Sequence, residues 1–228
     1  MTIPNRITRL WKSWWPTLLT IVVVFSFRAA VADWYDVPSG SMQPTLLEGD
    51  RITCDKTAYD WRLPIVGVVA HRNDPERGDV VIFPSPTDGT RLVKRIVAVQ
   101  GDLVELRDNR LHLDGQPAIY ISGPADIPWK LPKEDTAPHV YLREELAGVD
   151  HAVMLTPGHA QRSSFGPMRV PPGKYLMMGD NRDNSADSRW FGFVDRGAIV
   201  GRVDAVAFSV DRDRWWKPRW NRFARGLS

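Results

Sequence analysis

The chain has 228 residues, enough for one large domain or two small ones, and its 18 prolines and 17 glycines suit a loop-rich β protein better than a helical bundle. Its single cysteine, Cys54, excludes an internal disulfide. Residues 1–12 carry a charge of +3 and residues 212–225 carry +5, so the body between them must carry −5 to give the net +3 of the chain. An acidic body argues against nucleic acid as a partner, because phosphate binding needs a basic face.

The segment 14–32 is apolar except for two threonines, one serine and Arg28. About 20 residues in a helix cross a hydrocarbon core of ~30 Å, so we expect a transmembrane anchor over residues 13–33. The bases at residues 1–12 predict a cytoplasmic N-terminus and a body outside the cytoplasm. The alternative is a cleavable signal peptide, because Ala30-Val31-Ala32 fits a small-x-small cleavage site. Arg28 argues against it, since it lies so close to that site.

The next stretch, residues 37–50, places Ser39 and Ser41 on either side of a glycine. Its prolines and glycines prevent a helix, because proline lacks an N–H and glycine favours turns. We therefore expect Ser41 on an irregular loop. On this stretch alone, a turn that only joins the anchor to a domain is an equally good interpretation.

Two strand patterns follow, at residues 80–83 and, more clearly, at residues 91–99. With a two-residue period, Lys94 lies on an otherwise apolar face of the second strand. Loss of solvation there disfavours the ammonium and lowers the pKa of the lysine. Lys94 is therefore a candidate base, and a lysine on an exposed strand edge is the alternative.

The overall pattern predicts a mainly β protein with an antiparallel catalytic core. This core is expected from residues 34–102 and 174–211, with strands at 174–178 and 201–210. Short strand patterns such as 103–106 and 111–113 alternate with loops rich in proline, glycine and aspartate between them. We interpret residues 103–173 as an inserted second, smaller β lobe.

Residues 212–228 form a basic tail that also contains three tryptophans. Tryptophans and cations together are typical of a membrane interface, so this tail is expected to lie against the lipid bilayer. A solvated C-terminal tail is the equally weighted alternative.

A serine hydroxyl needs a base to become a good nucleophile. Serine–lysine pairs are a known arrangement in serine hydrolases, so Lys94 is the stronger candidate for this base. No motif surrounds the histidines, which are interpreted as surface residues: His71, His112, His139, His151 and His159.

The stretch 180–189 is rich in Asp, Asn and Ser. An EF-hand counted from Asp180 or Asp183 would place Ser185 or Ser188 where glycine is required. No metal site is therefore predicted. We interpret the stretch as a polar loop that holds a nearby site through its own hydrogen bonds.

Three stretches together resemble, in the same order, the motifs of bacterial type I signal peptidases: Pro38-Ser39-Gly40-Ser41-Met42, Lys94-Arg95 closing on Gly101-Asp102, and Gly179-Asp180-Asn181-Arg182-Asp183-Asn184-Ser185-Ala186-Asp187-Ser188-Arg189. The resemblance implies a single-pass serine endopeptidase of the bacterial inner membrane, with its catalytic domain on the periplasmic side. It would remove signal peptides from exported preproteins after an Ala-x-Ala site, without a metal or cofactor.

The resemblance also implies roles for individual residues. Ser41 would be the nucleophile and Lys94 its general base, while Ser39 and the Ser41 N–H would form the oxyanion hole. Ser185 would orient the lysine, with Asp187 and Arg189 paired behind it. Shallow apolar pockets for small residues would be lined, by position, by Val37, Met42, Leu46, Leu92 and Val93.

The chain departs from the usual family pattern in two places. Trp34-Tyr35-Asp36 replaces a phenylalanine-containing run, and the inserted lobe lacks the cysteine pair of some members. Two other functions stay open. One is a peptidase of the same kind dedicated to a single pilus or conjugation protein, and the other is an inactive, membrane-tethered module that binds extended peptides. The anchor disfavours a self-cleaving repressor.

Overall fold

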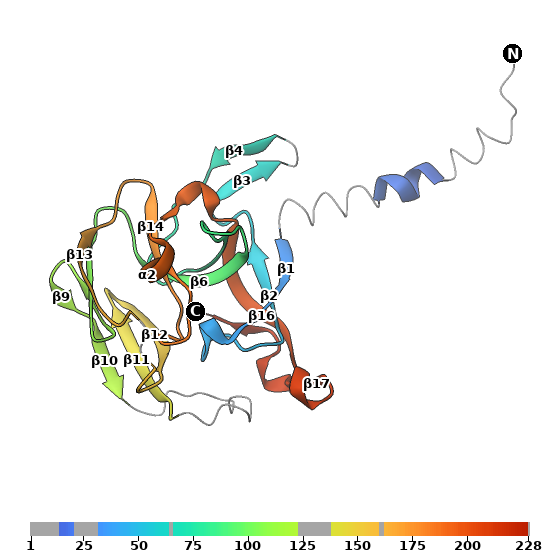
Figure 1. The fold of residues 1–228 in the computed structure, drawn as a ribbon. Helices are drawn as coiled ribbons and strands as arrows, with labels where there is room; N and C mark the ends of the chain where they lie inside the picture. The colour runs from blue at the N-terminus through green and yellow to red at the C-terminus, as the bar shows by residue number, and fades with distance from the viewer. Residues whose placement is uncertain (1–13, 21–31, 64–65, 123–137, 160–161, 228) are drawn as a thin grey trace, which may run out of the picture.

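The computed structural model describes residues 14–20, 32–63, 66–122, 138–159 and 162–227. The named strands pair only in antiparallel fashion within these residues, and the protein is mainly β (Figure 1). Residues 14–20 are helical, and no helix among the described residues is long and apolar enough to span a membrane. The expected cytoplasmic residues 1–12, and residues 13 and 21–31 of the expected anchor, lie outside the described part of the chain.

The largest sheet has the strand order β1-β2-β16-β5-β6-β14-β15, and β17 and β18 also pair with β16. Its strands are β1 (Ala32–Asp36), β2 (Asp50–Asp55), β5 (Val80–Pro84), β6 (Arg91–Ala98), β14 (Lys174–Met178), β15 (Val194–Asp195), β16 (Gly201–Asp211), β17 (Lys217–Pro218) and β18 (Arg225–Gly226). The four strands expected in the core, β5, β6, β14 and β16, are confirmed to within one residue at each end. β1 includes the last two residues of the range expected for the anchor.

Two smaller sheets come from the segment between β6 and β14, and Figure 1 shows them on the side of the molecule away from β1. One contains β10 (Ile119–Ser122), β11 (Val140–Leu146) and β12 (Val149–Leu155). The other contains β7 (Leu103–Arg107), β8 (Arg110–Leu113), β9 (Gln116–Pro117) and β13 (Phe165–Arg169). We refer to these two sheets as the inserted sheets.

A separate hairpin, β3 (Asp60–Leu63) and β4 (Gly67–His71), projects from the main sheet (Figure 1). The remaining elements are short: α2 (Ser188–Phe191) and the 3₁₀ turns η1 (Gly40–Met42), η2 (Arg196–Ala198), η3 (Arg212–Arg214) and η4 (Trp220–Arg222).

Three apolar clusters fill the interior. The cluster beneath η1 contains Val37, Met42 and Leu46, and another, built on β5 and β6, contains Phe83 and Ile96. The third lies between β6, β14 and the inserted sheets. Most members of these clusters are aliphatic residues on the inward faces of paired strands, with leucine the commonest residue of the third cluster.

The basic C-terminal segment folds back onto the main sheet. β17 and β18 pair with β16, and the fully buried Arg222 donates from Nε to Asp50 at 3.0 Å. Three tryptophans of this segment remain largely exposed: Trp215, Trp216 and Trp220. The segment is therefore packed through its backbone and Arg222 while its indoles face outward.

Candidate active site

Ser41 lies at the centre of the 3₁₀ turn η1, which follows Ser39, a residue with an extended backbone. Asn181 holds this turn in two places. Its backbone N–H donates to the Ser41 carbonyl at 3.2 Å, and its side-chain Nδ2 donates to the Gly40 carbonyl at 3.1 Å. The turn is therefore fixed by the loop 179–189, although the two segments are far apart in the sequence.

Lys94 projects from β6 toward this turn. Its Nζ lies 2.6 Å from Ser41 Oγ and 3.1 Å from the Val93 carbonyl, and only 2% of the residue is exposed. Burial lowers the pKa of Lys94 to about 8, although the carboxylates of Asp187 and Asp180 act in the opposite direction. A neutral amine at this distance can accept the proton of a hydroxyl.

Ser39 lies on the exposed side of the same turn, with its Oγ 3.4 Å from Ser41 Oγ. This is a long contact between two hydroxyls, so it constrains either side chain only weakly. The Ser39 hydroxyl is therefore adjacent to Ser41 and open to an incoming group.

Ser185 lies beside Gly179, next to the turn that contains Ser41. A Cβ placed on Gly179 would lie 2.3 Å from Ser185 Oγ and 2.4 Å from the Ser41 carbonyl oxygen, so only glycine fits between them. The Ser185 Oγ is buried, and within the described residues it makes no hydrogen bond to Lys94. The structure thus brings Ser185 beside Ser41, while the bond expected between Ser185 and Lys94 is not made.

Asp187 and Arg189 form the ion pair that was expected. Asp187 accepts from Arg189 Nε and Nη2, both at 2.8 Å, and from the backbone N–H of Gly179 at 3.0 Å. Burial alone would raise the pKa of Asp187, but the hydrogen bonds from Arg189 hold it below its ordinary value. Asp187 also caps the short helix α2. The ionised Asp187 side chain therefore connects Gly179 to the start of α2.

The residues expected to line the substrate pockets divide between two clusters. Val37, Met42 and Leu46 are buried together, and Val93 packs against them. Leu92 instead packs against the cluster that contains Phe83 and Ile96. Neighbouring residues of a strand point to opposite faces, which is why Leu92 and Val93 pack against different clusters.

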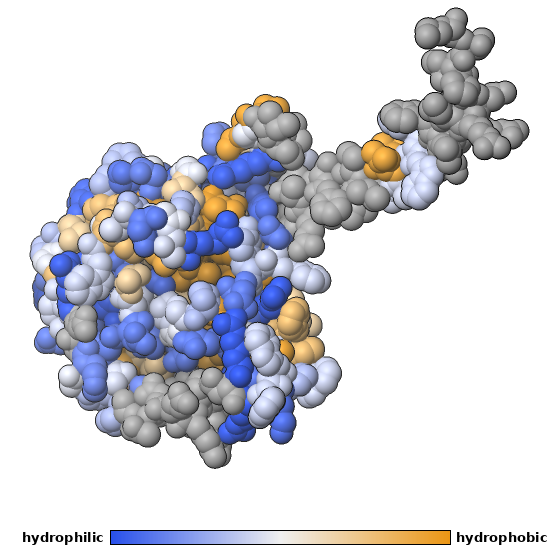
Figure 2. All heavy atoms as spheres, turned by 45° about the vertical axis from the view of Figure 1, so that its right-hand side comes forward, coloured by the Kyte–Doolittle hydropathy of each residue, from blue (hydrophilic) through white to orange (hydrophobic). Residues whose placement is uncertain are grey.

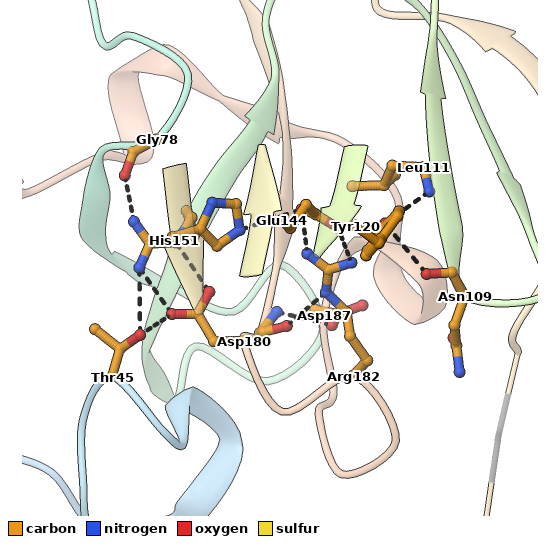
Figure 3. A network of polar contacts seen from close by, with 12 residues as sticks. Thr45, Gly78, Asn109, Leu111, Tyr120, Glu144, His151, Asp180, Arg182 and Asp187 are labelled. Carbon is orange, nitrogen blue, oxygen red and sulfur yellow. Dashed lines mark hydrogen bonds and ion pairs between the residues drawn. The ribbon is translucent and has the colours of Figure 1, made fainter. Parts of the chain in front are cut away.

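A network of buried charges holds the loop 179–189 (Figure 3). Arg95, next to Lys94 on β6, donates to both oxygens of Asp180 at 2.9 and 2.8 Å. Arg182 donates to both oxygens of Glu144 on β11, at 2.7 and 2.6 Å. The loop therefore has one bidentate ion pair to the main sheet and another to the inserted sheets.

His151 corrects one expectation. It was interpreted as a surface residue, but it is buried on β12 with its Nε2 3.1 Å from Glu144 Oε1. Burial lowers the pKa of His151, although the Glu144 carboxylate acts the other way. The alternating pattern of β12, with His151 and Val153 facing inward, was the only signal in the sequence.

Nothing near Glu144 in the sequence singled it out, because its partner lies in a distant motif. Asp180 and Arg182, by contrast, lie within the quoted motif, but their partners could not be identified from it. The sequence could not predict these ion pairs because each one joins segments that are far apart along the chain.

The sequence pattern of the family described as signal peptidase, peptidase S26, matches residues 10–208 of the chain. The chain belongs to this family. It is 35% identical to signal peptidase I of Pseudomonas fluorescens, a match that covers 91% of this chain and 73% of the relative. It is also 35% identical to signal peptidase I of Pseudomonas aeruginosa, covering 87% of this chain and 71% of the relative.

A solved signal peptidase I from Enterococcus faecalis is 30% identical, with a TM-score of 0.35 over 57% of this chain and 97% of its own. Membership of the S26 family rests on the sequence matches. The chain is therefore a serine peptidase of the S26 family.

Proposed function

We propose that this S26 peptidase removes N-terminal signal peptides from exported preproteins, with Ser41 as nucleophile and Lys94 as general base. The observation that carries the proposal is the 2.6 Å contact between Lys94 Nζ and Ser41 Oγ. Because Lys94 is buried and its pKa is lowered to about 8, a substantial fraction of the amine is neutral near physiological pH.

In the proposed reaction, Lys94 Nζ takes the proton of Ser41 Oγ as the oxygen attacks the scissile carbonyl. Ser39 Oγ–H and the Ser41 N–H donate to the oxyanion. The protonated Lys94 then gives its proton to the departing amine, which leaves an acyl-enzyme at Ser41. Lys94 next removes a proton from water, whose oxygen attacks the ester, and protonates the Ser41 oxygen as the signal peptide is released.

Ser185 and the ion pair between Asp187 and Arg189 would hold Ser41 and Lys94 in position. Ser185 Oγ and the Ser41 carbonyl both lie close to Gly179, and from this position Ser185 would orient the Lys94 amine by a hydrogen bond formed during the reaction. Asp187 fixes Gly179 through its backbone N–H. Burial has the largest effect on the pKa of Lys94, and the charge of Asp187 partly opposes it, so Asp187 would adjust the pH at which the amine becomes a base.

Cleavage after small residues, in an Ala-x-Ala pattern, would follow from the apolar residues around Ser41. Val37, Met42, Leu46 and Val93 are packed against one another beside η1. A depression over these residues that is only deep enough for a methyl group would exclude larger side chains sterically. Leu92 lies two residues before Lys94 on β6, on the same face of the strand, and would complete the lining of the pockets.

Membrane attachment is the other part of the proposal. A helical anchor that lies within the expected range 13–33 and ends before β1 would hold the protein in the bacterial inner membrane, with its N-terminus in the cytoplasm and its catalytic part, residues 34–102 and 174–211, on the periplasmic side. The basic, aromatic segment 212–228 would contact the same bilayer. The substrate's signal peptide would reach Ser41 from that membrane.

The test is cleavage of a preprotein with an Ala-x-Ala site in detergent, with sequencing of the new N-terminus. Ser41→Ala and Lys94→Ala should abolish cleavage, while the matched exposed controls Ser122→Ala and Lys174→Ala should cleave like the wild type. Activity in either of the first two variants would contradict the proposed pair of residues.

The same assay separates the alternatives. A wild-type protein that binds the preprotein without cutting it would be a peptide-binding module. A protein that cuts one pilus or conjugation protein and no general preprotein would be a dedicated peptidase. Either result would replace general signal-peptide removal as the function.

A further inference from the structure

One edge of β6 has no partner strand beside Ser41. β5 pairs with β6 from Arg91 to Arg95, whereas β14 pairs with the other edge only from Arg95 onward. Within the described part of the chain, no strand pairs with residues 91–94 on that second edge. Ser41 lies beside Gly179, the residue that follows β14, so the open edge begins at the expected nucleophile. An extended peptide that pairs with this edge therefore passes Arg91.

Arg91 continues a row of apolar residues along this edge. Four side chains packed beside η1 form what we call the apolar wall: Val37, Met42, Leu46 and Val93. Arg91 comes two residues before Val93 on β6 and so lies on the same face of the strand. Its guanidinium carbon lies 4.7 Å from the centre of the Tyr35 ring, and Tyr35 belongs to the same cluster as the wall. The wall therefore ends in a cation that is attracted to an aromatic face.

The positive charge of Arg91 pairs with no carboxylate among the described residues. Two acids close to it in the structure or the sequence have other partners. Asp33 accepts from Lys56 Nζ at 3.1 Å, and Asp88 accepts from the Thr90 N–H at 3.0 Å and hydroxyl at 2.8 Å. The Arg91 side chain is exposed, so its charge is available to a ligand.

Exposure and charge alone do not make an arginine a binding residue. Hydrophilic residues cover much of the face shown in Figure 2. Arg110 on β8 also stacks on a tyrosine, with its guanidinium carbon 5.4 Å from the centre of the Tyr120 ring. Arg110, however, belongs to the inserted sheets, whereas Arg91 lies three residues from Lys94 on β6, a span of about 10 Å in an extended strand. The position of Arg91 is therefore what distinguishes it.

The alternation of side chains in a strand decides which substrate residue Arg91 meets. The two small residues of an Ala-x-Ala site share one face of an extended peptide, where they would contact the apolar wall. The next residue on that face is the second one before the site. Arg91 follows Val93 in the same way on β6, so the two side chains would face each other.

We propose that Arg91, held on Tyr35, selects signal peptides that carry an acidic residue at the second position before the Ala-x-Ala site. The planar guanidinium offers paired N–H donors that match the two oxygens of a carboxylate. The contact is the same in the ground state and the transition state, so it should lower KM and leave kcat unchanged. The inference rests on the proposed peptidase function and names the class of signal peptide that it favours.

The test compares three short peptides that share an Ala-x-Ala site and carry Glu, Gln or Lys at the second position before it. The wild type should cleave the Glu peptide with a kcat/KM about threefold above that of the Gln peptide, as expected for an exposed ion pair. The Lys peptide should be the slowest. The differences should lie in KM and shrink in 1 M salt, because salt screens exposed charges.

Variants at position 91 test whether this residue sets the order. Arg91→Gln should cleave the three peptides at equal rates, and Arg91→Glu should prefer the Lys peptide. The matched control is Arg110→Gln, which should keep the wild-type order. Equal rates on the three peptides in the wild type, or an unchanged order in Arg91→Gln, would overturn the proposal.

Binding separates this inference from the peptidase function. Fluorescence anisotropy with labelled peptides should show that Ser41→Ala binds the Glu peptide about threefold more tightly than the Gln peptide. Cleavage of all three peptides without this order would leave the peptidase function standing and refute the role of Arg91. The expected order of binding in a wild type that cleaves none of them would do the reverse. A protein that neither binds nor cleaves them would refute both.

Discussion

The guanidinium of Arg182 donates to both carboxylate oxygens of Glu144, and both side chains are buried. Arg182 belongs to the loop that holds the Ser41 turn, while Glu144 lies on β11 of the inserted sheets (Figure 3). Burial alone would raise the pKa of Glu144, but the charge of Arg182 holds it well below its ordinary value. Glu144 is therefore an ionised carboxylate, and its ion pair with Arg182 attaches the loop 179–189 to the inserted sheets.

Replacing Glu144 should destabilise the protein strongly. Glu144→Gln leaves the charge of Arg182 buried without a counterion, which costs about 3–5 kcal/mol of unfolding free energy. Urea unfolding monitored by tryptophan fluorescence measures the loss. The same change at the exposed neighbouring residue, Glu145→Gln, should have little effect. Equal losses in the two variants would show that the buried pair contributes nothing particular.

The pH dependence of cleavage should report Lys94. Burial lowers the pKa of Lys94 to about 8, and only the neutral amine can accept the Ser41 proton. The value of kcat/KM for a short peptide should therefore rise with pH and level off above about 8. A rate that keeps rising to pH 10.5, the ordinary value for lysine, would contradict the desolvated amine.

The same lysine should reduce stability. The folded-state pKa of Lys94, about 8, lies below the value of 10.5 in the unfolded chain, so the folded state disfavours the ammonium. Below pH 8 the full cost applies, on the order of 3 kcal/mol, and it disappears as the pH rises toward 10.5. Lys94→Met should therefore be inactive yet more stable at neutral pH. The exposed control, Lys174→Met, should not gain stability, and a loss in Lys94→Met would refute the argument.

Gly179 should not tolerate a side chain. The Cβ of alanine would lie 2.3 Å from Ser185 Oγ and 2.4 Å from the Ser41 carbonyl, so either the loop or the turn must shift. A displacement of about 1 Å at a catalytic group can cost about 100-fold in rate. We expect Gly179→Ala to lose kcat by about that factor. Gly197→Ala, where the added Cβ meets no atom within 4 Å, is the control and should keep the wild-type kcat.

The sequence was informative where a local pattern determines structure. The β-branched run around Lys94 predicted β6 to within one residue, and the small, polar motifs around Ser41 and Ser185 identified residues that lie close together. Strands with strong periodicity and motifs rich in glycine carry their own signal.

Features that depend on distant partners escaped the sequence. His151 is buried because Glu144 and the neighbouring strands surround it. In the hairpin that begins near Trp61, a proline and a glycine interrupt the strand pattern and conceal it. The C-terminal segment was ambiguous for the same reason, since the burial of Arg222 depends on Asp50, 172 residues earlier.

The ion pair between Arg222 and Asp50 should make the C-terminal segment contribute to the stability of the whole fold. Arg222 donates to Asp50 and to the Thr45 carbonyl, and Asp50 also accepts from the Leu47 N–H. Arg222→Met removes the cation and leaves the buried carboxylate without its counterion, which should cost about 3–5 kcal/mol in urea unfolding.

Two further variants test whether the charge is responsible. Arg214→Met, at a side chain that is 58% exposed, should change stability by less than about 0.5 kcal/mol. Adding Asp50→Asn to Arg222→Met removes the unpaired charge and should recover part of the loss. If the double variant were less stable than Arg222→Met alone, the cost would come from lost packing and hydrogen bonds around Arg222 and not from the buried carboxylate. Recovery would instead show that the unpaired Asp50 carboxylate at the start of β2 causes the loss in Arg222→Met.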